Sequence, residues 1–411
     1  MLVAAKPAQS VLDITGICVH ANWISSTTPQ WDNPNWQDKV LEIGAQHVRT
    51  AIGSSKAVLP NIQKLIDDKV TFCITVAGDD ISPARYPKIE ANIDFAADNL
   101  GPLLVGIESV NEYNHNHPTN WVEDMRRFQK WLYTTVRGNA KLAHVPVVAP
   151  SIWGRTTADY KALGDLRPNI DLNCAHVYPG GRRPTRAKPA DGKEYSIDQC
   201  FKEAQILGPG LPLMLTEYGY EQGTPYSTHK LPPLLSAKYT IRGLLDYLER
   251  KIVQKVYIYA LVDDVPAPNP DHLWGLYKTG YSAGKPVFTI REVGKAVSNL
   301  LKLFNIVGTV SGGRLDYTLS GITDKIRTQL FQRNDGKFIL TMYQDVDIWN
   351  RTTKKEIINK AIPVKIVFAN PPSKVEVYHP SIDSSVKQSA SLLSQITVNV
   401  PDHIAAILIT P

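Results

Sequence analysis

The segment Val105–Tyr113, with the sequence VGIESVNEY, begins like a buried strand and ends in an amide and a carboxylate side by side. A surface turn would explain one Asn-Glu pair, so the meaning of the pair depends on where the strand lies in the fold. Seven other short apolar runs have the same character. The expected strands are residues 14–19, 47–51, 70–77, 104–110, 145–150, 170–176, 212–217 and 255–261.

A helix-like segment follows each expected strand, with apolar residues three and four positions apart, as in AKYTIRGLLDYLER. Near-continuous apolar strands that alternate with helices indicate parallel strands under an outer helical layer. Eight such units predict a (β/α)8 TIM barrel. A doubly wound open sheet is the alternative, but CVHANWISS after the first strand lacks a Gly-rich phosphate-binding turn. The expected helices are residues 37–45, 57–68, 88–99, 119–137, 157–164, 196–207, 236–250 and 288–304.

The pattern of apolar and polar residues changes after about residue 306. Alternating segments such as RTQLFQRN and KFILTMYQD are separated by Gly, Asn-Asp-Gly and Pro-Pro. This pattern predicts a small antiparallel β-sandwich domain. We therefore expect a catalytic barrel over residues 13–305 and an accessory sandwich over residues 306–411, to which residues 1–12 would add a strand.

Charge and composition exclude several classes of partner. The 411 residues carry a net charge of +6 without a Lys/Arg-rich block, so nucleic acid is a poor candidate, and no apolar run is long enough to span a membrane. The N-terminal residues do not resemble a secretory signal, so we expect a secreted or periplasmic protein whose signal has been removed, or a cytoplasmic one. Of the four cysteines, we expect buried free thiols, with a Cys174–Cys200 disulfide as the alternative.

Two carboxylates stand at expected strand ends. Glu112 ends the fourth strand, directly after Asn111, and Glu217 ends the seventh in LMLTEYGYE. The active site of a TIM barrel is built at the carboxyl ends of its strands, so both side chains are expected over one mouth. Retaining glycoside hydrolysis requires such a pair, with carboxyl groups about 5 to 5.5 Å apart. Two unrelated surface or ion-paired carboxylates are the alternative.

These residues resemble a known family. The eight-unit pattern, the VNE that ends the fourth strand and the LTEYG that ends the seventh resemble clan A glycoside hydrolases, and the trailing β domain is similar to the accessory sandwich of families 39, 30 and 79. The resemblance implies that Glu112 is the general acid/base and Glu217 the nucleophile. It also implies that Asn111 binds the sugar 2-hydroxyl. The fourth strand lacks the proline common after the acid/base, and the eighth ends in YALVDD, where many members place a tryptophan.

The same resemblance assigns three supporting residues. Arg49, in HVRT, matches the arginine that keeps the nucleophile ionised, and His176 and Tyr178, in AHVYPG, match a His-x-Tyr pattern. Tyr178 is expected to orient Glu217. For Glu112, we expect burial and the neighbouring negative charge to raise its pKa, so that it starts the cycle protonated. A structural ion pair is the alternative role for Arg49, as is a structural hydrogen bond for His176.

Further residues follow the strands on the same face. Trp23, Trp153 and Trp274 are candidate sugar-stacking platforms, with core packing as the alternative. Four aspartates are candidate hydroxyl binders or ordinary loop carboxylates. The loop after the sixth strand is basic, which suggests contact with an anionic polysaccharide unless it is a solvated surface run. The aspartates are Asp79, Asp80, Asp263 and Asp264, and the loop cations are Arg182, Arg183, Arg186 and Lys188.

Together these features predict an enzyme, a retaining glycoside hydrolase that cleaves an oligo- or polysaccharide by double displacement. We expect a monomer that needs no metal or organic cofactor. A non-catalytic carbohydrate-binding barrel is the first alternative, and possession of both glutamates argues against it. A metal-dependent barrel enzyme is the second; it would need ligand clusters that the expected strand ends do not supply.

Overall fold

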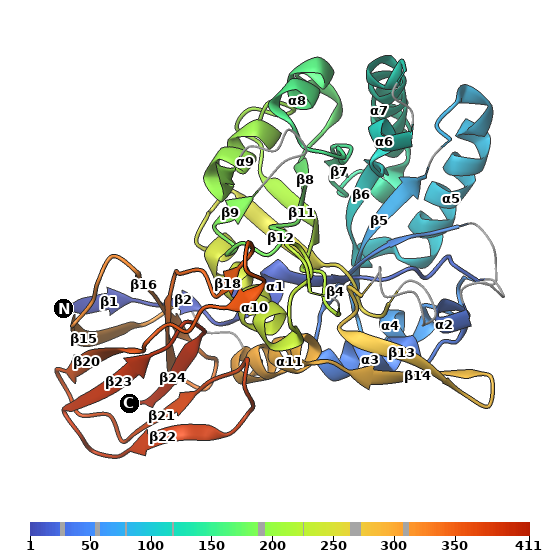
Figure 1. Ribbon diagram of the computed structural model, residues 1–411. Helices are drawn as coiled ribbons and strands as arrows, with labels where there is room; N and C mark the ends of the chain where they lie inside the picture. Colours follow the sequence, from blue (N-terminus) through green and yellow to red (C-terminus); the bar gives the residue numbers. More distant parts are fainter. Residues whose placement is uncertain are drawn as a thin grey trace.

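The barrel is the central feature of the computed structural model, which describes residues 1–24, 29–53, 58–78, 80–116, 119–187, 194–224, 226–263, 273–306 and 312–411 (Figure 1). Its parallel strands form one sheet in the order β7-β6-β5-β4-β3-β12-β11-β8, and a bridge between Val148 and Leu172 joins the two ends. The predicted TIM barrel is therefore confirmed. The strands are β3 (Thr15–Cys18), β4 (His47–Ala51), β5 (Thr71–Ala77), β6 (Leu104–Val110), β7 (Val147–Val148), β8 (Asn173–Val177), β11 (Leu213–Tyr218) and β12 (Val253–Ile258).

Helices cover the outside of the barrel (Figure 1). In α7, for example, buried Met125, Phe128, Leu132 and Val136 recur three or four residues apart and give the helix one apolar face. The expected helix over 57–68 begins at a residue outside the described part of the chain. The covering helices are α3 (Trp36–Ile43), α4 (Gln63–Asp67), α5 (Tyr86–Asn99), α7 (Trp121–Gly138), α8 (Thr157–Leu163), α9 (Ile197–Ala204), α10 (Pro233–Leu248) and α11 (Glu292–Phe304).

Two local expectations about element bounds were wrong, whereas the expectation that the cysteines are free thiols is confirmed. The last helix begins at Glu292 and not at 288, because residues 285–290 pair with residues 277–282 in a hairpin of β13 (Tyr277–Ser282) and β14 (Lys285–Ile290). The strand expected over 145–150 is only two residues long. All four cysteines are free: Cys174 lies inside the barrel, where its Sγ is 2.9 Å from the Thr216 hydroxyl, whereas Cys200 lies on the outer helix α9.

Shorter elements connect these units. They are α1 (Gln9–Ile14), α2 (Pro29–Asp32), α6 (Tyr113–Asn116), the 3-10 turns Pro83–Arg85, Gly101–Leu103, Ala140–Leu142 and Arg167–Asn169, and the small strands β9 (Arg186–Ala187), β10 (Tyr195–Ser196), β18 (Trp349–Asn350) and β19 (Lys355–Glu356).

Two sheets form the C-terminal sandwich and take strands from both the first and the last residues of the sequence; their strands are antiparallel, except that β2 pairs with β16 in parallel. One sheet has the order β1-β15-β20-β23 and the other β2-β16-β17-β24-β21-β22. The strands are β1 (Leu2–Ala4), β2 (Lys6–Pro7), β15 (Arg314–Ser320), β16 (Ile326–Gln332), β17 (Phe338–Gln344), β20 (Ile362–Phe368), β21 (Lys374–Tyr378), β22 (Val386–Ala390), β23 (Gln395–Val400) and β24 (Ala405–Thr410).

The six-stranded sheet packs on the barrel as well as on its partner sheet. Strand β17 is buried along its whole length, since its alternate side chains face opposite layers. Leu340 and Met342 belong to the apolar core of the sandwich, whereas Ile339 and Tyr343 join the core that is continuous with the barrel. The sandwich is thus fixed against α10 and α11. None of the helices in the described ranges has the length and apolarity needed to cross a bilayer.

Candidate active site

A buried arginine organises the centre of the barrel mouth. Arg49 on β4 donates Nε and Nη2 to the two oxygens of Glu108, at 2.6 and 2.9 Å, and Nη1 to Oε1 of Glu217 at 2.8 Å. Its Nη2 also donates to Oδ1 of Asn111 at 2.7 Å. The planar guanidinium thereby sets the positions of three side chains from β6, β11 and the loop after β6.

Glu108 was missed by the sequence analysis, although it lies in the quoted segment. It is fully buried, and it accepts hydrogen bonds from Thr75 and Thr216, each at 3.1 Å. Burial alone would raise its pKa, but Arg49 and His176 lower the pKa of Glu108 to about 2. The negative charge of Glu108 therefore stays in place beneath the mouth and holds Arg49.

Glu112 stands at a strained point of the backbone. Its φ of 45° lies in the left-handed region, and its backbone N–H donates to the Ser151 hydroxyl at 3.0 Å. Helix α6 starts at the next residue. The chain thus turns sharply at the end of β6, which leaves the Glu112 side chain about one quarter exposed at the mouth.

His176 lies between the carboxylates. Its Nδ1 is 2.8 Å from Oε1 of Glu112 and 3.4 Å from Oε2 of Glu217, and its Nε2 is 3.1 Å from the Thr216 hydroxyl. Burial would lower the pKa of this imidazole, but the surrounding carboxylates outweigh burial and raise it to about 9. At neutral pH, His176 is therefore an imidazolium with both ring nitrogens protonated, and its Nδ1–H donates a hydrogen bond to Glu112.

The expected pKa of Glu112 was wrong in direction. Burial does act to raise it, but the hydrogen bond and the positive charge of His176 prevail and lower the pKa of Glu112. The neighbouring carboxylates can be expected from the sequence, whereas the positive charge of His176 arises only in the folded site. Between these two groups, the proton therefore lies on the histidine.

Tyr178 and the aromatic residues near it form one wall of the mouth. The Tyr178 hydroxyl donates to Oε2 of Glu217, and its ring meets Trp274 edge-on with centroids 4.9 Å apart. Trp274 also contacts Tyr259, which follows β12, at 6.2 Å. The eighth strand has no tryptophan at its own end, but Trp274, which comes later in the chain, lies close to that end.

The two candidate catalytic carboxylates lie close together. An oxygen of Glu112, an oxygen of Glu217 and a nitrogen of His176 all lie within 4.8 Å of one another. Such a set resembles a metal-binding cluster, but a protonated imidazole cannot ligate a cation, and Arg49 already neutralises Glu217. Cys174 belongs to a second cluster with Glu108 and His176, and burial raises the pKa of its thiol well above the usual value. Both clusters are better suited to hydrogen bonding than to metal binding.

Two exposed indoles stand away from this centre. Trp23 follows β3, is 37% exposed and stacks on His20 with centroids 3.9 Å apart. Trp153 follows β7, is 44% exposed and packs on His115 at 4.4 Å. Each has one face supported by a histidine, as a stacking platform requires. Trp274, by contrast, is half-buried among tyrosines.

The basic loop is held largely by protein carboxylates. Arg182 is buried and pairs with Glu194 at 3.0 Å, and Arg183 contacts Asp345 of the sandwich. Asp263 is also buried, and pairs with Arg291 at 2.6 Å, so it acts as a structural anchor rather than a hydroxyl binder. Asp79, Asp264 and Lys188 lie outside the described residues.

Of the site residues that the sequence did not predict, one has a recognisable signal in the sequence and three have none. Glu108 interrupts an apolar strand, and a buried charge requires a partner, so the strand position of Glu108 is a signal for an ion pair such as the one it forms with Arg49. Thr75, Thr216 and Ser151 gave no such signal, because hydroxyl residues are common in strands and loops.

Comparisons with known proteins are limited to the fold. No protein-family model matches the chain, and no curated protein matches its sequence. Among solved structures, Bacteroides uniformis β-glucuronidase 2 aligns with a TM-score of 0.50 and 13% identity over 98% of this chain and 45% of the other. A GH2 β-galacturonidase from Eisenbergiella tayi aligns with 0.49 and 16% identity, over 70% and 51%. The chain spans about half the length of these two enzymes.

A smaller protein aligns with the barrel-sized part of the chain. It is an active-site mutant of the Rhizomucor miehei β-1,3-glucanosyltransferase, with a TM-score of 0.46 and 15% identity over 69% of this chain and 98% of the other. At such identities, the first alignment shows that this chain shares its fold with a β-glucuronidase, and the two weaker alignments carry no argument.

Proposed function

We propose that the protein is a retaining glycoside hydrolase that acts on an oligo- or polysaccharide. The observation that carries this proposal is the approach of Glu112 and Glu217 to within 4.8 Å, oxygen to oxygen, at the carboxyl ends of β6 and β11. Retaining enzymes hold their carboxyl groups about 5 to 5.5 Å apart, whereas inverting enzymes need about 6.5 to 9.5 Å to admit a water molecule.

Glu217 suits the role of nucleophile. Arg49 donates to one of its oxygens and Tyr178 to the other, so the carboxylate is oriented before a substrate binds. Attack by Glu217 on the anomeric carbon would form a glycosyl-enzyme ester and break the glycosidic bond. When the carboxylate is consumed, Arg49 remains paired with Glu108, and this pairing limits the cost of the change in charge.

Glu112 suits the role of acid/base, with His176 as its proton source. The imidazolium lies 2.8 Å from Glu112, and a substrate that excludes water from the mouth makes a separated ion pair less favourable. Proton transfer from Nδ1 to Glu112 then gives a neutral imidazole and a carboxylic acid that can protonate the leaving oxygen. In the second half of the reaction, Glu112 accepts a proton from the attacking water.

Asn111 suits recognition of the sugar at the reacting position. Its Oδ1 is bound by Arg49 at 2.7 Å, and this contact fixes the amide and leaves Nδ2 to donate to a substrate hydroxyl. A hydrogen bond to the 2-hydroxyl that strengthens as charge develops on the ring lowers the barrier without tightening ground-state binding.

The test combines a screen with a stereochemical assay. Aryl glycosides and polysaccharides are screened for reducing-end release, and the anomer released first from the best substrate is identified by a proton NMR time course. Retention of configuration is expected, and an inverted first product would refute the proposal. Binding of sugars without hydrolysis of any of them would identify the alternative, a non-catalytic carbohydrate-binding barrel.

A further inference from the structure

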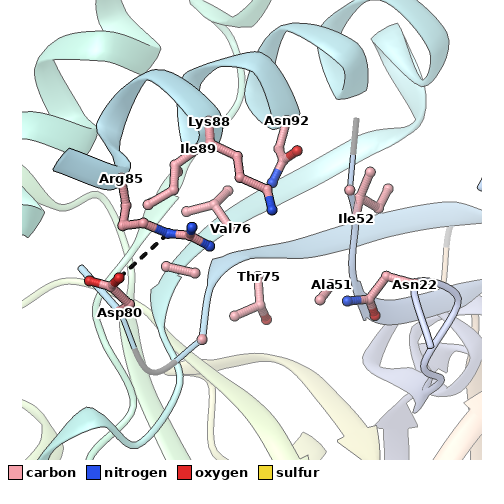
Figure 2. A pocket seen from close by; sticks show the side chains of 13 residues that line it. Asn22, Ala51, Ile52, Thr75, Val76, Asp80, Arg85, Lys88, Ile89 and Asn92 are labelled. Atoms are coloured by element: carbon pink, nitrogen blue, oxygen red, sulfur yellow. Dashed lines mark ion pairs between the residues drawn. The ribbon is translucent and has the colours of Figure 1, made fainter. Parts of the chain in front are cut away.

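A cleft of about 630 Å³ opens on the side of the mouth formed by β4 and β5. Its volume falls within the roughly 300–1,000 Å³ of typical ligand pockets. In Figure 2, Arg85, Lys88 and Asn92 reach into it from α5 and the turn before α5, opposite side chains of the strand ends. None of these residues takes part in the catalytic arrangement described above.

The cleft adjoins the candidate catalytic groups. Thr75, in its floor, donates to Glu108, which holds the Arg49 guanidinium that binds Glu217. Ala51, also in its lining, follows Arg49 by two residues on β4. A chain of sugars bound with one unit at Glu217 therefore has room for another unit in this cleft.

The wall formed by α5 is cationic. Arg85 pairs with Asp80 at 3.5 Å, but both side chains are about half exposed, 46% and 57%, so the pair is weak and can be replaced by a ligand anion. For Lys88, the described residues supply no ion-pair partner. By contrast, Arg182 and Arg183 in the basic loop are already bound to Glu194 and Asp345.

The opposite side offers amide and apolar contacts. Asn22 lines the cleft, and its side-chain oxygen is buried without a hydrogen-bond partner among the described residues. Rotation of that amide would present the oxygen to a sugar hydroxyl. Ile52, Val76 and Ile89 supply the apolar surface on which the C–H face of a sugar ring can lie.

We propose that this cleft is a subsite for a sugar unit that bears a carboxylate, next to the unit whose bond is cleaved. Arg85 and Lys88 bind the anion, and the asparagine amides bind hydroxyl groups. The inference rests on the proposed function for the position of the scissile bond, but binding in the cleft can be measured without turnover.

The experiment measures binding to the Glu217→Gln variant by calorimetry, so that hydrolysis does not interfere. The probes are trimers of glucuronate, galacturonate and mannuronate beside the neutral trimers of glucose, galactose and mannose. At least one acidic trimer is expected to bind more tightly than its neutral partner, and added salt should reduce the difference. If no acidic trimer is preferred, the inference is overturned.

Two double variants in the same background locate the anion. Arg85→Gln with Lys88→Gln should weaken the preferred acidic trimer roughly three- to tenfold, as expected for two partly exposed ion pairs, and change the neutral trimer by less than about twofold. The matched control, Lys130→Gln with Lys202→Gln, removes two exposed charges from α7 and α9 and should have no effect on either. An equal loss of affinity for the acidic trimer in both double variants, or no loss in the Arg85→Gln, Lys88→Gln variant, would overturn the assignment.

The test of the subsite and the test of the proposed hydrolase activity can fail independently of each other. Hydrolysis of neutral substrates with retention, without any preference for acidic trimers, would leave the function intact and remove the subsite. A preference for acidic trimers that depends on Arg85 and Lys88, in a protein without hydrolytic activity, would leave the subsite and remove the enzyme.

Discussion

Two buried arginines each organise carboxylates in this protein, Arg49 at the barrel mouth and Arg242 between the barrel and the sandwich. Arg242 is fully buried on α10, donates to the backbone carbonyls of Val346 and Asp402, and lies 3.3 Å from Asp345. Beside it, the Asp246 carboxylate accepts the Tyr343 hydroxyl at 2.6 Å, and burial raises the pKa of Asp246 to about 6.

The difference lies in what each arginine leaves accessible. The network of Arg242 is closed by the sandwich, and two of its acceptors are backbone carbonyls, so it contributes to the docking of two domains. The network of Arg49 ends at Glu217 and Asn111, next to a quarter-exposed Glu112. The two networks therefore differ in that a carboxylate beside Arg49 is accessible from the barrel mouth, as a functional site requires.

The largest effect should follow substitution of the mouth carboxylates. Glu217→Gln and Glu112→Gln should each lower kcat at least about 10³-fold, or ~4 kcal/mol in the activation barrier, because in the proposed mechanism each removes a group that forms or breaks bonds. The melting temperature should change little, since Gln preserves the shape of the side chain. Glu90→Gln, an exposed substitution on α5, is the control for activity. Near-normal turnover in either variant would remove the assignment.

The opposite pattern is expected at the interface. Arg242→Met should lower the free energy of unfolding by about 3–5 kcal/mol, because it leaves Asp345 buried with less compensation, while the proposed activity of the folded protein stays normal. Arg327→Met is the matched control, since Arg327 meets the same carboxylate at 3.4 Å but is 46% exposed, and it should cost less than about 1 kcal/mol. Chemical denaturation measures both. Equal losses would show that burial does not distinguish the two pairs.

His176 should make stability depend on pH. Its pKa rises from 6.5 to about 9 on folding, so its contribution is fully present below pH 6.5 and is lost as the pH rises through 9. The stability difference between the wild type and His176→Gln should therefore shrink over this range, by at most about 3 kcal/mol. Denaturation at a series of pH values tests this. A difference that stays constant from pH 6 to 9 would mean that the imidazole is not protonated in the folded protein.

The smallest effect is expected for an exposed aromatic residue at the mouth. Trp153→Ala should raise KM for a polymeric substrate by a factor that corresponds to about 0.5–1.5 kcal/mol, with little change in melting temperature. Trp349→Ala, which removes a buried indole beside the sandwich, should show the reverse, a lower melting temperature with KM unchanged. Steady-state kinetics and thermal unfolding of both variants sharpen the contrast between the two regions.

The barrel could be predicted from the sequence, but the interface between the barrel and the sandwich could not, and helix α10 shows why. Its apolar residues, three and four positions apart, predict a helix of the outer layer with one apolar face. In the structure, the polar stripe of Lys238, Arg242 and Asp246, spaced four residues apart, is buried against Asp402, Asp345 and Tyr343 of the sandwich. Local periodicity identifies a polar face but cannot say whether water or another domain covers it.

The candidate site was predictable to a similar degree. The strand ends gave Glu112 and Glu217, because position along a barrel strand determines which residues reach the mouth. The proton on His176 was not predictable, since it depends on three carboxylates that meet only in the fold. Asp263 was ambiguous for the same reason, as its partner Arg291 lies 28 residues further along the chain.

The pairing of β1 and β2 with strands of the sandwich affects how the protein folds during synthesis. Leu2 pairs with Asp316 and Lys6 with Phe331, so the first strands of the chain acquire their partners only after the whole barrel has left the ribosome. The barrel can fold as a unit while β1 and β2 have no strand partners and their edges are exposed to other chains. Completion of the sandwich then joins β1 to β15 and β2 to β16, across the whole barrel sequence, which makes assembly of the two domains a late and long-range step.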